Sequence, residues 1–196
     1  MTGPRATLLI PAWNEGSVIA ATLSGLLRTA TAGEFHVIVI ANGCSDDTAT
    51  AALCAAPRAV VIETPQPGKA RALNLGYAHA LPDRPVICLD ADLSVTATAL
   101  RALLAPIETG QAKAACGRMI AQTDGASRAV RAFHAAWALN PYFAQGKFGG
   151  LFALSPVAAR TIFPLPPVIA DDEYIRRSLD PAEIAFVPGC SFTARA

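Results

Sequence analysis

The stretch Val86-Ile87-Cys88-Leu89-Asp90-Ala91-Asp92 is a short apolar run that ends in two carboxylates separated by one residue. A continuous apolar run of this length is typical of a strand buried on both faces of a parallel sheet. Asp90 and Asp92 would then stand at the carboxyl end of the strand, where open α/β sheets bind ligands. Neighbouring carboxylates repel each other, so Mg²⁺ or Mn²⁺ would stabilise the pair. The plainer alternative is that Asp92 caps the next helix and Asp90 is only solvated.

Strand and helix patterns alternate on the amino-terminal side of this stretch. Such an alternation predicts right-handed crossovers and a mostly parallel central sheet flanked by helices, which is an α/β fold. The expected strands are residues 7–11, 36–41 and 59–63. The first expected helix covers residues 17–28 and is capped by Ser17. The second is capped by Ser45 or Asp46 and ends near Pro57, and the third covers residues 69–80.

The pattern changes after residue 92. We expect helices at 96–107, 125–139, from Pro156 onward and at 171–179, strands at 114–119 and 184–187, and a loop over 140–150. The prolines within 163–167 exclude regular structure there. Because no repeat or low-complexity linker interrupts the chain, we expect a single domain over residues 1–196. The change of pattern divides this domain into two halves, the first reaching about residue 95 and the second beginning at about residue 96.

Composition narrows the class of protein. Hydrophobic residues make up 53% and charged residues 16% of the chain, as in a well-buried globular protein. No stretch approaches the ~20 consecutive apolar residues of a spanning helix. The net charge is +1 and no Lys/Arg cluster stands out, which argues against a nucleic-acid groove but leaves a peripheral membrane contact open. Five dispersed cysteines and the lack of room for a secretory signal predict a cytosolic protein, and a place at the inner face of a membrane stays open.

Four polar groups follow predicted strands: Trp13-Asn14-Glu15, the turn that begins at Asn42, Lys69 with Arg71, and Asp90 with Asp92. In a parallel sheet all four converge on one crevice. Trp13 could stack on a nucleotide base or pack against its own turn. Two cations at a helix start oppose the helix dipole unless an anion such as a diphosphate lies there, although both could simply be solvated.

A second acidic cluster is Asp171-Asp172-Glu173. Acidic residues are favourable in the first turn of a helix, and this accounts for the cluster by itself. Alternatively, one of the three is a general base, because crowding raises the proton affinity of a carboxylate. The signatures of serine hydrolases, P-loop NTPases and dinucleotide-binding folds are missing from the sequence.

The motifs together resemble family 2 glycosyltransferases of the GT-A fold. The matching segments come in the family's order and spacing: Pro11-Ala12-Trp13-Asn14-Glu15, Asn42-Gly43-Cys44-Ser45-Asp46-Asp47-Thr48, Gly68-Lys69-Ala70-Arg71, Leu89-Asp90-Ala91-Asp92, Gly149-Gly150-Leu151-Phe152 and Ala170-Asp171-Asp172-Glu173. The resemblance covers nearly the whole chain.

The resemblance implies inverting transfer of a sugar from a nucleotide-diphosphate donor, most often a UDP-sugar, with a divalent cation, Mn²⁺ or Mg²⁺. The half up to about residue 95 would be the nucleotide-binding half, and the half from about residue 96 would be the acceptor half. The acceptor would be an unknown glycan, lipid or small molecule. By analogy, Asp92 is the metal ligand and Asp172 the catalytic base. The donor-binding residues would be Pro11, Trp13, Glu15, Asn42, Lys69, Arg71, Asp90, Ala91 and Gly150.

Three departures from the family pattern bear on function. Ala41-Asn42 stands where the family has an acidic pair that contacts the base, and Asp171-Asp172 replaces Glu-Asp. The chain ends at Ala196, before the Gln-x-x-Arg-Trp segment of processive members, which favours single-sugar transfer or a truncated form. Two other functions stay open: a degenerate nucleotide-sugar-binding protein and a nucleotidyltransferase. The second normally has a basic, glycine-rich loop after its first strand, and this loop has no basic residue.

Overall fold

The computed structural model describes residues 3–123, 125, 127–138 and 148–195. Seven strands form one sheet in the order β3-β2-β1-β4-β6-β5-β7, and β6 is the strand that runs antiparallel to its neighbours. The prediction of a single α/β domain with a mostly parallel sheet is therefore confirmed. The strands are β1 (Ala6–Ala12), β2 (Phe35–Asn42), β3 (Val60–Thr64), β4 (Val86–Leu89), β5 (Ala114–Gln122), β6 (Leu151–Leu154) and β7 (Ile184–Arg195).

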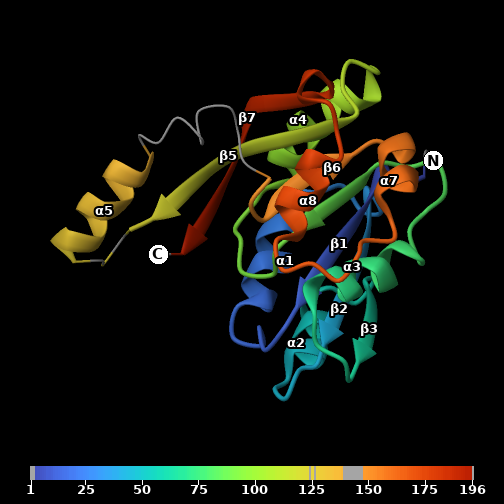
Figure 1. Cartoon of the computed structure of the whole chain (residues 1–196). Coiled ribbons are helices and arrows are strands. Elements are labelled where there is room, and N and C mark those ends of the chain that lie inside the picture. Colours follow the sequence, from blue (N-terminus) through green and yellow to red (C-terminus); the bar gives the residue numbers. More distant parts are fainter. Residues whose placement is uncertain (1–2, 124, 126, 139–147, 196) are drawn as a thin grey trace.

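Helices cover both faces of the sheet (Figure 1). One face packs against α1 (Ile19–Leu27), α2 (Thr48–Ala55) and α4 (Ala97–Glu108), and the other against α3 (Lys69–Tyr77), α7 (Pro156–Ile162) and α8 (Asp171–Arg177). The helix α5 (Arg128–Ala138) extends from the end of β5, away from these layers, and a short 3-10 helix (Pro181–Glu183) precedes β7. Among the described residues, no helix has the length and apolar character needed to cross a membrane.

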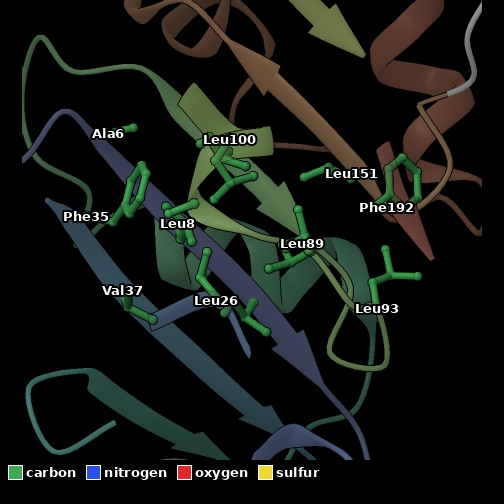
Figure 2. Packing of buried hydrophobic residues seen from close by; sticks show 14 of the residues in the cluster. Ala6, Leu8, Leu26, Phe35, Val37, Leu89, Leu93, Leu100, Leu151 and Phe192 are labelled. Atoms are coloured by element: carbon green, nitrogen blue, oxygen red, sulfur yellow. The ribbon is translucent and has the colours of Figure 1, made fainter. Parts of the chain in front are cut away.

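Alternation along the buried strands explains the two-sided core. In β1, Leu8 and Ile10 point to the α1 and α4 side, whereas Leu9 points to the α3 side. Figure 2 shows the first of these cores, in which Leu8 lies among Leu26 of α1 and Leu100 of α4. Because both faces are buried, the strands carry continuous apolar runs.

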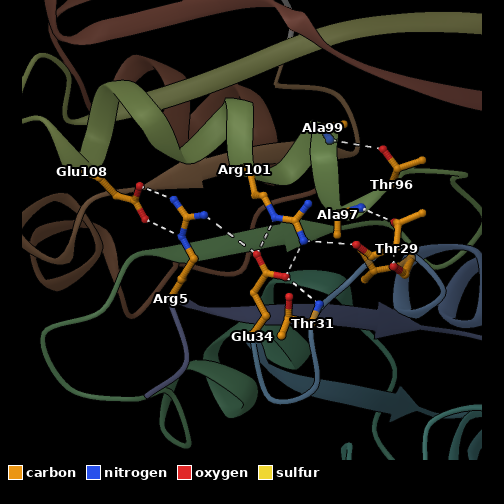
Figure 3. Close-up of polar contacts among 10 residues, drawn as sticks. Arg5, Thr29, Thr31, Glu34, Thr96, Ala97, Ala99, Arg101 and Glu108 are labelled. Carbon is orange, nitrogen blue, oxygen red and sulfur yellow. Dashed lines mark hydrogen bonds and ion pairs between the residues drawn. The ribbon is translucent and has the colours of Figure 1, made fainter. Parts of the chain in front are cut away.

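Charged side chains join the starts of β1 and β2 to α4, at the amino edge of the sheet (Figure 3). The Arg101 guanidinium donates to both carboxylate oxygens of Glu34, at 2.7 Å each. Arg5 donates to both oxygens of Glu108, at 3.0 and 2.6 Å. These bidentate pairs fix α4 against the strand starts, at the edge opposite the polar groups that follow the strands.

Several predicted boundaries need correction. The expected Ser17 cap is wrong: α1 begins at Ile19, and the amides of Val18 and Ile19 donate to the backbone carbonyl of Glu15 at 3.0 and 2.9 Å. The expected cap of α2 is also wrong: its N-cap is Asp47 rather than Ser45 or Asp46, although Asp46 Oδ1 accepts from the amide of Thr48, the first helical residue, at 3.1 Å. The helix expected at 125–139 is α5, and most of the loop expected at 140–150 lies outside the described residues.

The last strand is much longer than predicted. β7 was expected to end at residue 187 but continues to Arg195, passing through Pro188 and Gly189. These two residues lie at a register shift against β5, which falls between Cys116 and Arg118. β7 is an edge strand, and a proline is tolerated at an edge or a bulge because no ladder hydrogen bond is lost there.

Candidate functional site

The loops after β1, β2 and β4 enclose a cleft of about 470 Å³ at the carboxyl edge of the sheet. Eight of the residues singled out in the sequence line this cleft, and the loop before α3 completes it. We call it the donor cleft, after the expectation from sequence that these residues bind a nucleotide-sugar donor. The lining residues are Pro11, Trp13, Glu15, Asn42, Pro67, Gly68, Lys69, Asp90, Ala91 and Asp92. The expected convergence of strand-end residues is thus present in the fold.

The loop after β1 is held open toward the cleft by the loop after β2. The Glu15 amide donates to the Thr48 hydroxyl at 2.8 Å, and the Gly16 amide donates to the Asp46 carboxylate at 2.9 Å. Trp13 lies on this loop and is 60% exposed, so it does not pack against its own turn. Its ring is available to a flat ligand.

Asn42 forms a buried bridge on the floor of the donor cleft. Its side-chain amide donates to the carbonyls of Ala12 and Ile40, at 2.7 and 3.4 Å, and its Oδ1 accepts from the Gly68 amide at 3.0 Å. Nδ2 faces two carbonyl oxygens and Oδ1 faces an N–H group, so these partners assign the positions of the nitrogen and the oxygen in the Asn42 side-chain amide. Asn42 therefore ties the ends of β1 and β2 to the start of α3.

The Asp90-Ala91-Asp92 segment is fixed from both sides of the sheet. The Gly150 carbonyl accepts from the Asp90 amide at 2.8 Å, and the Ala91 carbonyl accepts from the Thr22 hydroxyl at 2.8 Å. Gly150 has φ +82°, and a Cβ there would lie 3.0 Å from Asp90 Oδ2. Glycine is required at that position because a side chain would crowd the carboxylate.

The structure contradicts the alternative that Asp92 is a helix cap. The cap of α4 is Thr96, whose hydroxyl accepts from the Ala99 amide at 3.2 Å. Asp90 is not merely solvated either, since its Oδ1 lies 2.6 Å from Lys69 Nζ.

Like charges are concentrated in the donor cleft. Burial raises the pKa of Glu15, and the nearby carboxylates of Asp92, Asp46 and Asp90 raise it further. Burial alone would lower the pKa of Lys69, but Asp90 and Asp171 outweigh it and hold that pKa above its ordinary value. Lys69 is therefore a cation surrounded by acids, and the cleft has negative charge in excess of it.

A second cleft, of about 400 Å³, opens beside the first and shares Lys69, Asp90 and Asp92 with it. We call it the α8 cleft. Its other lining residues come from β5, the loop before β6, the start of α8 and the end of β7: Leu93, Met119, Gly149, Gly150, Ile169, Asp171, Asp172 and Ala194. The shared residues make one continuous site with two compartments.

The three residues of the acidic cluster differ in exposure and in their contacts. Asp172 is partly exposed in the α8 cleft, and its Oδ1 accepts from the Glu173 amide at 2.8 Å. Asp171 is 3% exposed, and burial raises its pKa while Lys69 opposes that rise. Glu173 instead pairs with Arg176 and Arg177, at 2.9 and 2.6 Å. The cluster is thus more than a favourable helix start.

Arg71 is the one sequence-predicted residue that lines neither cleft; it donates to Gln66 on the surface. Several lining residues went unpredicted. Met119 and Ala194 lie in strand segments at or beyond the predicted ends of β5 and β7, and Pro67 lies directly before the matching segment Gly68-Lys69-Ala70-Arg71. Long-range pairing of the strand ends brings Met119 and Ala194 to the α8 cleft, so no local signal pointed to these two residues.

The carboxylates of the donor cleft suit a hard divalent cation that is also coordinated by oxygens of a bound ligand. Within the described ranges, no three His, Cys, Asp or Glu side chains gather closely enough to hold a metal ion by themselves. Asp90 and Asp92 do line one cleft with Glu15, whose pKa is raised first by burial and further by these two carboxylates and Asp46. Mg²⁺ in nucleotide sites is usually bound by one or two carboxylates together with phosphate oxygens, and this arrangement fits that pattern.

Comparison with known proteins identifies a family and a shared fold. The model of glycosyl transferase family 2 matches residues 7–159. An uncharacterized glycosyltransferase of Mycobacterium tuberculosis is 33% identical over 111 residues, which cover 56% of this chain and 47% of that protein. The chain thus matches only about half the length of this curated relative.

Solved structures share the fold across nearly the whole chain. The crystal structure of a mycobacterial protein has a TM-score of 0.72 at 21% identity and covers 97% of this chain and 67% of its own. Glucosyl-3-phosphoglycerate synthase from M. tuberculosis, in complex with Mn²⁺, uridine-diphosphate-glucose and phosphoglyceric acid, has a TM-score of 0.70 at 23% identity, with coverage of 97% and 70%. The same synthase is also known with Mg²⁺ and uridine diphosphate, at 23% identity and a TM-score of 0.70.

Proposed function

Because the chain belongs to glycosyl transferase family 2, we propose that it transfers a sugar from a nucleotide-diphosphate donor, with a UDP-sugar as the leading candidate, to an acceptor hydroxyl with inversion. The observation that carries the proposal is the sharing of Lys69, Asp90 and Asp92 by the donor cleft and the α8 cleft. A donor diphosphate at these three residues would place its sugar toward Asp172.

The donor cleft offers complementary contacts for each part of a nucleotide sugar. The exposed ring of Trp13 can stack on the base. Lys69 is the first residue of α3, so its ammonium and the helix amino terminus both favour a diphosphate. Asp92, with Asp90, would hold Mn²⁺ or Mg²⁺ on the diphosphate, and the cation would neutralise the charge that grows there during transfer. The structure of glucosyl-3-phosphoglycerate synthase in complex with Mn²⁺ and uridine-diphosphate-glucose, which shares this fold, supports this choice of ligands.

Asp172 is the candidate base in the α8 cleft. Its carboxylate would take the proton of the acceptor hydroxyl while the acceptor oxygen forms a bond to the anomeric carbon. The bond from that carbon to the diphosphate oxygen breaks with its electron pair, so the configuration inverts. The acceptor remains a glycan, a lipid or a small molecule, and a cytosolic location remains a prediction from the dispersed cysteines.

The test replaces the base and measures donor hydrolysis, in which water takes the place of the acceptor. In Asp172→Asn, Mn²⁺-dependent UDP affinity should stay within about twofold of wild type, while release of free sugar from a UDP-sugar should fall roughly 100-fold or more. Asp83→Asn is the matched control, since Asp83 is an exposed carboxylate paired with Arg160, away from both clefts.

Two results would count against the proposal. Normal sugar release by Asp172→Asn would reject Asp172 as the base. Complete absence of sugar release by the wild-type chain, across a panel of nucleotide sugars that it binds, would favour the degenerate binding protein instead.

A further inference from the structure

Lys69 lies between two carboxylates that come from opposite halves of the chain. Its Nζ is 2.6 Å from Asp90 Oδ1, at the end of β4, and 3.7 Å from Asp171 Oδ2, at the start of α8. The shorter contact is a charge-assisted hydrogen bond, and the longer one is an ion pair without a hydrogen bond. Lys69 thus connects the donor cleft to the element that carries Asp172.

Asp171 Oδ2 is buried and accepts no hydrogen bond from any described residue. Asp171 as a whole is 3% exposed, so bulk water cannot fully replace the missing donor. A buried carboxylate oxygen without a donor is strongly unfavourable, and structures that keep one usually reserve it for a partner. The nearest cation is the Lys69 ammonium, at 3.7 Å.

Lys69 and a bound donor would compete for the Asp90 carboxylate. Its Oδ1 is engaged by the ammonium, yet Asp90 lines the donor cleft beside Asp92, where a ribose hydroxyl or a diphosphate-bound cation would need it. A cation at Asp92 would also repel the nearby ammonium. When the donor binds, Lys69 should therefore leave Asp90, and a small movement brings it to the free oxygen of Asp171.

We propose that Asp171 is a positioning residue: it receives the Lys69 ammonium when the donor takes Asp90, and so keeps Lys69 beside the diphosphate. The inference rests on the proposed donor site and adds a role for a residue that itself touches neither donor nor cation. Without the Asp171 charge, the ammonium would have no fixed second partner, and the diphosphate would lose a preorganised contact.

A double-mutant cycle on donor affinity tests this role. UDP is titrated calorimetrically in the presence of Mn²⁺ into the full chain and into Asp171→Asn, Lys69→Met and the double variant. Asp171→Asn should weaken binding by roughly tenfold, within the range found for coupled neighbours. The double variant should bind no more weakly than Lys69→Met alone, because Asp171 acts through the lysine.

Conservative variants separate positioning from a purely structural role. Asp171→Glu keeps the charge within reach of Lys69 and should bind UDP within about threefold of wild type, whereas Asp171→Gln, of the same size, should bind as weakly as Asp171→Asn. If circular dichroism shows that Asp171→Asn does not fold, Asp171→Gln takes its place in the cycle and Asp171→Glu serves as the control.

Each outcome decides a different claim. Unchanged affinity in Asp171→Asn, or losses that multiply in the double variant, would overturn the positioning role while leaving the donor site intact. Equal losses in Asp171→Glu and Asp171→Gln would assign Asp171 a packing role instead. Failure of the wild-type chain to bind UDP with Mn²⁺ would overturn both the proposed function and this inference.

Discussion

At the scale of single residues, Asn42 shows how a departure from the family pattern is built into the fold. Its amide donates to the carbonyls of Ala12 and Ile40 and accepts from the Gly68 amide. The acid that the family resemblance leads one to expect here has no hydrogen to donate. An aspartate would leave the Ala12 carbonyl facing a carboxylate oxygen in a site that is 3% exposed.

We therefore predict that Asn42→Asp destabilises the protein and does not improve UDP binding. The loss of the two donated hydrogen bonds in a buried site should lower the free energy of unfolding by about 2 kcal/mol. In a chain of this length that corresponds to a melting temperature roughly 4–8 °C lower. Gln66→Glu makes the same change of amide to carboxylate at an exposed side chain, and its melting temperature should stay within about 1 °C of wild type. A more stable Asn42→Asp protein with tighter UDP binding would refute this view of Asn42.

At the scale of elements, the cluster of Arg5, Glu34, Arg101 and Glu108 locks α4 to the starts of β1 and β2. The hydrogen bonds from Arg101 lower the pKa of Glu34, and burial only partly opposes them. The Glu34 side chain is 7% exposed, so this pair is screened less than an ordinary surface ion pair. The cluster lies at the opposite edge from the clefts and should affect stability rather than ligand binding.

Glu34→Gln should lower the melting temperature by roughly 3–6 °C at pH 7. The pKa of Glu34 is lower in the folded than in the unfolded chain, so its stabilisation is complete above the ordinary carboxyl pKa. The stabilisation is lost as the pH falls through the lowered folded value. The gap between wild type and variant should thus be constant from about pH 7 to 5.5 and shrink below about pH 4. Glu63→Gln, at an exposed position of β3, is the control, and a gap that widens in acid would be inconsistent with the ion pair.

The ends of elements were harder to predict than their existence. The apolar runs of β1, β2 and β4 identify buried strands because both faces of the sheet are covered. The continuation of β7 past Pro188-Gly189 was missed, because the sequence alone does not tell an edge strand with a register shift from a strand that stops.

At the scale of the whole molecule, the strand order explains why most of the site was predictable. β1, β2 and β4 run parallel, so the residues that follow them must meet at one edge. That rule brought Trp13, Asn42 and Asp90 together from sequence alone. The approach of Asp171 to Lys69 was not predictable, because it depends on how the irregular segment before α8 packs against α3, where the Asn74 side chain bonds to the backbone of Leu165.

For the whole molecule, we propose that the carboxyl edge of the sheet binds a nucleotide diphosphate through a divalent cation held by Asp92. The most direct measurement is calorimetric titration of UDP into wild type and Asp92→Ala, each with and without Mn²⁺, with Asp83→Ala as the control for loss of an exposed carboxylate. Wild type and the control should bind UDP roughly tenfold or more tightly with Mn²⁺, and Asp92→Ala should lose that dependence. UDP affinity that is the same with and without Mn²⁺ in wild type, or a metal dependence that survives in Asp92→Ala, would contradict the claim.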